Sequence, residues 1–106
     1  MKRIIVQHMV RNEMTGDGEG FNDIAFVRAD IEDINQALEY AYRWTNNIEG
    51  SWSRRDIPNN SDFNPMVVCL EDREDGLGQR STAMFDRMLV DGKTYEVRMS
   101  GFKEIA

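Results

Sequence analysis

The sequence predicts an α+β domain in which a mostly antiparallel sheet carries one amphipathic helix, at about residues 31–46, on one face. Segments rich in β-branched residues occur on both sides of a single helical apolar stripe, and an Asp-Gly dipeptide inside an alternating segment marks a tight hairpin. The 106 residues match a common domain size. No repeat or linker divides them, so we expect one domain over residues 1–106.

Two strands are expected in the first third of the chain. Residues 3–10, RIIVQHMV, place apolar side chains on both faces of a strand, which is typical of a central strand. Residues 11–20 contain three glycines among small polar residues and are expected to form a loop. Residues 21–29, FNDIAFVRA, then predict a second strand, antiparallel to the first.

The helix is expected to begin at Asp30, whose carboxylate can accept hydrogen bonds from the first-turn amides. Glu32 and Asp33 then lie where the helix dipole favours negative charge. The apolar stripe consists of residues three or four positions apart: Ile31, Ile34, Leu38, Ala41, Tyr42 and Thr45. Asn46 and Asn47 should end the helix, because asparagine tolerates the left-handed conformation of a C-cap.

The second half of the chain begins with a long polar connection over residues 46–65. Connections of about twenty residues without regular structure are uncommon in compact domains and are often functional. Residues 66–70, MVVCL, predict a short buried strand, and residues 71–79 predict another loop. Residues 101–105, GFKEI, predict a final extended segment.

The clearest local pattern is the hairpin RMLV-DG-KTYEV, residues 87–97. Asp91 and Gly92 suit a tight two-residue turn. This turn sets Val90 opposite Lys93, Met88 opposite Tyr95 and Arg87 opposite Glu96, as cross-strand pairs. The residues expected on its apolar face are Met88, Val90, Tyr95 and Val97.

The formal net charge is −6, and residues 12–40 carry much of the acidity. Because nucleic-acid affinity depends on cations that neutralise phosphates, this balance makes general nucleic-acid binding unexpected. An acidic face could instead meet a basic protein surface, where complementary charge accelerates association. Its members would be Asp17, Glu19, Asp23, Asp30, Glu32 and Asp33. The alternative is an ordinary solvated surface with a capped helix.

A second candidate surface combines Trp52, Arg54 and Arg55 of the long loop with Arg80. Tryptophan offers a stacking plane and arginine grips phosphate, which suits a nucleotide or a single nucleic-acid strand. The alternative is a connector in which Trp52 is buried while the neighbouring arginines pair with acidic residues of the same loop, Asp56 or Asp62.

Catalytic, metal and cofactor chemistry are not expected. His8, the single histidine, lies on an apolar strand face, and Cys69 is flanked by apolar residues, so both are interpreted as core residues. The sequence TGDGEG lacks the Lys-Ser/Thr ending of a phosphate loop. The acidic cluster within residues 71–75 is interpreted as solvated loop rather than a metal site.

The cellular setting is expected to be cytoplasmic. The single cysteine cannot form an internal disulfide, which favours a reducing compartment. No apolar run approaches the roughly 20 residues of a membrane span, and the first residues are too polar for a signal peptide. We therefore expect no membrane partner.

Residues 37–53, ALEYAYRWTNNIEGSWS, and 79–105, QRSTAMFDRMLVDGKTYEVRMSGFKEI, resemble small proteins of tailed bacteriophages and prophages. In those proteins a helix ends in a Thr-Asn-Asn-like turn and a Trp, and an Arg-Ser-Thr motif follows. An aspartate-bearing segment, a DG-type hairpin and a closing Gly-Phe complete the pattern. Here Met84-Phe85 stands before Asp86, where the phage proteins usually carry a small residue and glycine.

The resemblance implies a phage-type accessory protein of unassigned role, in the host-cell cytoplasm if it is phage-encoded. The expected function is non-enzymatic binding of a host or viral protein. The alternative is a small nucleotide or single-stranded nucleic-acid binding module that uses the 46–65 loop.

Overall fold

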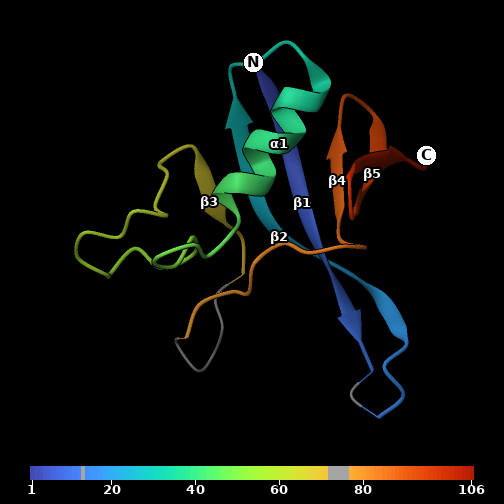
Figure 1. Ribbon diagram of the computed structural model, residues 1–106, viewed down its shortest axis with the longest axis horizontal. Coiled ribbons are helices and arrows are strands. Elements are labelled where there is room, and N and C mark those ends of the chain that lie inside the picture. The colour runs from blue at the N-terminus through green and yellow to red at the C-terminus, as the bar shows by residue number, and fades with distance from the viewer. Residues whose placement is uncertain (13, 72–76) are drawn as a thin grey trace.

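The computed structural model describes residues 1–12, 14–71 and 77–106. It confirms the α+β class, with a six-stranded antiparallel sheet in the order β3-β2-β1-β4-β5-β6 and one helix across one face (Figure 1). The elements are β1 (Lys2–Arg11), β2 (Gly18–Ala29), α1 (Ile34–Trp44), β3 (Val67–Cys69), β4 (Arg87–Val90), β5 (Lys93–Arg98) and β6 (Gly101–Glu104).

Strand β1 is central, as its two apolar faces predicted, and it pairs with β2 on one side and β4 on the other. The prediction of a loop over residues 11–20 was wrong at both ends. β1 runs to Arg11 and β2 already begins at Gly18, so the two strands form a long hairpin arm. Two register shifts interrupt their pairing. Such irregularities allow glycine-rich sequence to stay within a strand pair.

The helix begins later than expected, and Asp33 rather than Asp30 is its N-cap. The Asp33 carboxylate accepts a hydrogen bond of 2.9 Å from the amide of Gln36, while β2 continues to Ala29. Both aspartates suit an N-cap, and strand pairing through residue 29 selects the later one. The first turn therefore contains no acidic residue, contrary to the expectation for Glu32 and Asp33.

The helix ends at Trp44 with Thr45 as its C-cap, in a conformation that is not left-handed. Asn46 helps to end it by a different route than expected, because its side-chain amide donates to the carbonyl of Tyr42. Tyr42 itself is 37% exposed, so it lies at the margin of the apolar stripe. Ala37, which the predicted stripe omitted, is fully buried.

The core lies between α1 and the covered face of the sheet. Its centre is formed by alternate strand residues and the inner side of the helix, with Trp52 as the one member from the long loop: Ile4, Val6, Ile24, Ala25, Val27, Ala29, Ala37, Leu38, Ala41, Trp52, Val67, Met88, Val90, Tyr95 and Val97. Only Val67 of the predicted buried strand belongs to it, because β3 is an edge strand whose next residue, Val68, faces the other way and is 37% exposed. In the described ranges no helix has the length and apolarity needed to cross a membrane.

The β4–β5 hairpin has the predicted register, with Arg87, Met88 and Val90 opposite their expected partners. Asp91 and Gly92 both adopt positive φ, 53° and 74°, as a type I′ turn requires. The predicted apolar face is buried in the core. The final extended segment is also confirmed, as β6.

We expect Gly92→Val to lower the free energy of unfolding by about 1 kcal/mol or more, because a β-branched residue resists positive φ. No heavy atom lies within 4 Å of a Cβ built at Gly92, so the loss would come from backbone strain and not from a clash. Gly92→Asn is the matched control and should be less destabilising, since asparagine tolerates this conformation. Thermal and urea melts measure both; equal stability of the Val and Asn variants would contradict the turn assignment.

Candidate functional site

The 46–65 loop is organised around a buried carboxylate, that of Asp62. This residue is 1% exposed, and its Oδ2 accepts hydrogen bonds from three consecutive backbone amides, those of Ile48, Glu49 and Gly50, at 2.9, 2.9 and 2.6 Å. Its Oδ1 lies 3.2 Å from a guanidinium nitrogen of Arg43 on α1. Burial raises the pKa of Asp62, but the three amides and Arg43 outweigh burial and leave the pKa lowered.

Asn60 adds a second set of bonds inside the same loop. Its Oδ1 accepts from the amides of Ser51 and Asp62, and its Nδ2 donates to the carbonyls of Ser51 and Arg54. The long connection is thus held by side chains that take the place of a helix or strand.

Trp52 anchors this loop, as expected for a buried indole. It is 3% exposed, and its Nε1 donates a 2.9 Å hydrogen bond to the carbonyl of Arg80, while its amide donates to Oδ1 of Asn47. The amide of Asn47 donates in turn to Oγ of Ser81. The segments after α1 and before β4 therefore form one bonded unit.

The arginines predicted to bind a ligand are engaged within the chain. Arg54 forms a two-point contact with Asp56, at 2.9 and 3.2 Å, as one of the alternatives anticipated. Arg55 donates to the carbonyl of Val67 at 3.4 Å. Asp62, the other proposed acidic partner, contacts Arg43 instead.

Arg80 belongs to a second buried carboxylate centre, that of Asp86. Both terminal nitrogens of Arg80 donate to Asp86, at 2.6 and 2.8 Å, and the amides of Met9 and Ala83 complete the set at 2.8 Å each. Burial raises the pKa of Asp86, but these donors outweigh it and the pKa is lowered. Sequence reasoning considered Asp62 only as a partner of Arg54 or Arg55 and Asp86 only as part of the resemblance; it did not predict that either carboxylate is buried and accepts backbone amides.

His8 lies beside this centre and is 4% exposed. Thr45 donates its hydroxyl proton to the carbonyl of Ala41, and Thr82 donates its own to Oγ1 of Thr45. Each hydroxyl has one proton, so the 2.9 Å contact between Oγ1 of Thr82 and Nε2 of His8 requires the Nε2–H tautomer. The imidazole also meets the Trp52 indole edge-on, with ring centroids 6.3 Å apart.

The remaining imidazole nitrogen, Nδ1 of His8, has no hydrogen-bond partner. Burial, followed by the charge of Arg80, lowers the pKa of His8 to about 4, although Asp86 acts in the opposite direction. His8 is buried and bonded within the chain, which confirms its interpretation as a buried residue. Within the described residues no cluster of three or more potential metal ligands occurs.

The acidic residues proposed as one face are distributed over the molecule. Asp17 and Glu19 lie in the arm formed by β1 and β2, whereas Asp30 and Glu32 lie at the opposite end of β2, where the chain turns towards α1 (Figure 1). Asp23 is between them and accepts a bond from Gln7 on the sheet. Of the acidic cluster in residues 71–75, all members but Glu71 lie outside the described residues.

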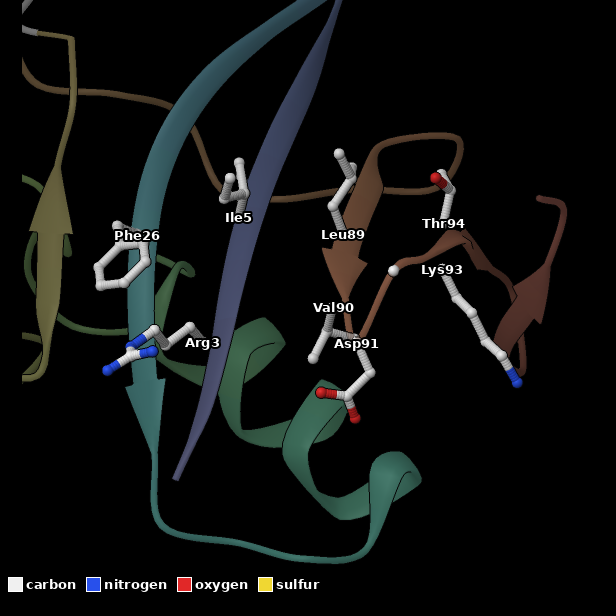
Figure 2. Close-up of a pocket in the computed structure, with 9 residues that line it drawn as sticks. Arg3, Ile5, Phe26, Leu89, Val90, Asp91, Lys93 and Thr94 are labelled. Carbon is white, nitrogen blue, oxygen red and sulfur yellow. The ribbon is translucent and has the colours of Figure 1, made fainter.

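The sheet face opposite α1 has a feature that sequence reasoning did not anticipate. Four apolar residues are direct cross-strand neighbours in a line across β3, β2, β1 and β4, and Thr94 of β5 continues the line: Val68, Phe26, Ile5 and Leu89. We call these four residues the apolar row. Figure 2 shows Phe26, Ile5, Leu89 and Thr94 lying across neighbouring strands. The row adjoins a shallow depression of about 370 Å³, and each of its members is partly exposed.

This uncovered face is also cationic. Among the residues that strand pairing places on it, basic residues outnumber acidic ones: Arg3, Arg11, Arg28, Arg87, Arg98 and Lys103 against Asp23 and Glu96. No family model, curated protein or solved structure matches the chain. Because no relative supplies site residues, the candidate site is the uncovered face of the sheet, with its apolar row and its basic side chains.

Asp62→Asn should destabilise the protein by roughly 2 kcal/mol or more, because it removes a charge that satisfies buried donors. Hydrogen exchange at the amides of Ile48, Glu49 and Gly50 should accelerate. Asp56→Asn is the control, since this carboxylate is 71% exposed and should change the melting temperature little. Unchanged exchange at the three amides in Asp62→Asn would contradict the assigned contacts.

Stability should fall as the pH is lowered from about 6.5 to about 4. His8 binds a proton more weakly in the folded state, with a pKa of about 4 against 6.5, so the unfolded chain takes up more protons in this window. The full loss is on the order of 3 kcal/mol. Asp62 and Asp86, with lowered pKa values, lose their contribution only at lower pH. Urea melts of wild type and His8→Gln measure this; an identical pH dependence of the two would exclude His8 as its source.

Proposed function

We propose that this chain is a non-enzymatic accessory protein of phage type that binds a host or viral protein through the uncovered face of its sheet. One observation carries the proposal: the apolar row is partly exposed at the centre of that face, and among the described residues no helix or strand packs over it. Contiguous apolar surface with a polar surround is characteristic of protein-interaction sites.

The other side chains considered for catalysis or ligand binding are buried or already bonded within the chain, which supports the uncovered face as the binding surface. The hydroxyls of Thr45 and Thr82 and the imidazole of His8 are buried and bonded to one another, so they are poorly placed to meet a substrate. Arg54 and Arg80 are bound by carboxylates, which leaves them less able to bind phosphate. Binding of a nucleotide or single nucleic-acid strand at the 46–65 loop is the alternative that the experiment must separate.

The experiment is affinity capture from a bacterial lysate with quantitative mass spectrometry of proteins and small molecules. Leu89→Lys places a charge in the apolar row and should abolish capture of the proteins enriched by wild type. Ile48→Lys is the matched control, because Ile48 is 63% exposed in the 46–65 loop, and it should capture the same proteins. Thermal melts verify that both variants fold.

Two outcomes would contradict the proposal. Capture of the same proteins by Leu89→Lys would show that the uncovered face is not the binding surface. Co-purification of a nucleotide or oligonucleotide that disappears in Arg54→Ala/Arg55→Ala would assign the function to the loop instead. Trp52→Ala would then weaken binding as well as stability, since the indole anchors that loop.

A further inference from the structure

We infer that the partner presents an acidic amphipathic helix, which lies along the apolar row with its carboxylates over Arg3 and Arg28. This inference rests on the proposed function and specifies the chemistry of the partner. It draws on the direction of the row, on two unpaired guanidinium groups beside it, and on the contrast between its two flanks.

The row has the length of a short helix. Its residues are direct neighbours across β3, β2, β1 and β4, and Thr94 extends it to β5. Five strands spaced about 4.8 Å apart span about 19 Å. At 1.5 Å per residue, this is the length of about 13 helical residues. A helix on this face would give the sheet a second covering layer opposite α1.

One flank of the row presents two cations without partners, besides the carboxylate of Asp91, which is already bonded to Lys2 at 2.6 Å. Arg3 and Arg28 are directly opposite each other on β1 and β2, and both side chains are exposed. In the part of the chain that the structure describes, neither side chain has an ion pair or hydrogen bond. Like charges directly opposite across a strand pair are unfavourable. A carboxylate bound between them would remove that repulsion and gain charge-assisted hydrogen bonds.

The other flank differs, because several of its polar groups are already engaged within the sheet. Gln7 donates to Asp23 at 2.8 Å, and the guanidinium of Arg98 lies 2.7 Å from Glu96. Arg87 lies over the ring of Phe21, 4.0 Å from its centroid. The partner helix is therefore expected to carry its carboxylates on one side only, towards Arg3 and Arg28.

The same face is less suited to other occupants. Single-stranded nucleic acid needs aromatic rings on which bases stack, and Phe26 is the single aromatic residue of the apolar row. A second copy packed face to face would bring two surfaces with an excess of basic residues together, which opposes association. These occupants become explicit outcomes of the test.

The test uses fluorescence anisotropy with three labelled probes. The first is a synthetic 14-residue helical peptide with leucines at i, i+3, i+4, i+7 and i+11, glutamates on one flank and glutamine elsewhere. The second has lysine in place of each glutamate, and the third is the oligonucleotide dT15. We expect the glutamate peptide to bind wild type, more weakly as salt rises, and the lysine peptide to bind much more weakly.

The decisive variants are charge reversals matched in size. Arg3→Glu/Arg28→Glu should weaken binding of the glutamate peptide by about tenfold or more and strengthen binding of the lysine peptide. Arg54→Glu/Arg55→Glu changes the net charge equally and should leave both affinities unchanged. Arg3→Glu/Arg28→Glu also keeps two like charges opposite each other, so its melting temperature should stay close to that of wild type.

Several results would overturn the inference. Equal binding of both peptides to wild type, or an equal loss in the two charge-reversal variants, would exclude specific recognition by Arg3 and Arg28. Tighter binding of dT15 that Arg3→Glu/Arg28→Glu abolishes would assign the face to nucleic acid. Dimerisation through this face in light scattering would assign it to a second copy. If Leu89→Lys prevents protein capture but the peptide results fail, the proposed function stands and only the acidic partner is excluded. If Leu89→Lys does not prevent protein capture, the proposed function itself is contradicted.

Discussion

Two buried carboxylates, those of Asp62 and Asp86, hold two segments that have no helix or strand, which are the 46–65 loop and the segment before β4. Backbone amides that leave a sheet or helix need other partners when they are buried, because an unpaired buried amide is costly. Asp62 accepts three consecutive amides after α1, and Asp86 accepts the amides of Met9 and Ala83 beside β1 and β4. Each carboxylate also has one arginine, from α1 or from the segment before β4, so its charge is compensated.

The Asp62 and Asp86 centres hold the 46–65 loop and the segment before β4 in place. Trp52 and His8 lie between these segments. The indole bonds the Arg80 backbone, and Arg80 in turn holds Asp86. Such a network links the long loop to the centre of the sheet through successive contacts rather than through one large apolar surface. It also engages Arg80, one of the arginines that resemble ligand-binding groups in the sequence. The proposed binding surface lies on the other side of the sheet.

Features set by residues close together in the sequence were predictable, and contacts between residues far apart in the sequence were not. The hairpin at Asp91-Gly92 follows from two residues that accept positive φ, and α1 follows from its apolar spacing. The helix start was misplaced because two aspartates three residues apart are equally good caps, and only the length of β2 decides between them. Asp62 could not be recognised, because its donors come from twelve to fourteen residues away.

The apolar row of the candidate site also could not be predicted, because it depends on the register of paired strands. Alternation within residues 3–10 correctly placed apolar groups on both faces of β1, yet a second layer of protein would explain that pattern equally well. The row becomes visible only when registers align Ile5 with Phe26 and with Leu89. The pairing of Arg3 with Arg28 likewise needs the register of β1 and β2, since the two residues are far apart in the sequence.

The strand order has a consequence for how the chain acquires its structure during synthesis. β1 is made first, yet one of its two neighbours, β4, pairs Met88 with Val6 and is among the last elements made. Until then β1 and β2 form a hairpin with one open edge and an incomplete core. Pairings of such high sequence separation slow folding, since the intervening chain must close a large loop. The edge of β1 that pairs with β4 therefore stays unpaired until β4 is available, and a chaperone that shields this edge would act before that point.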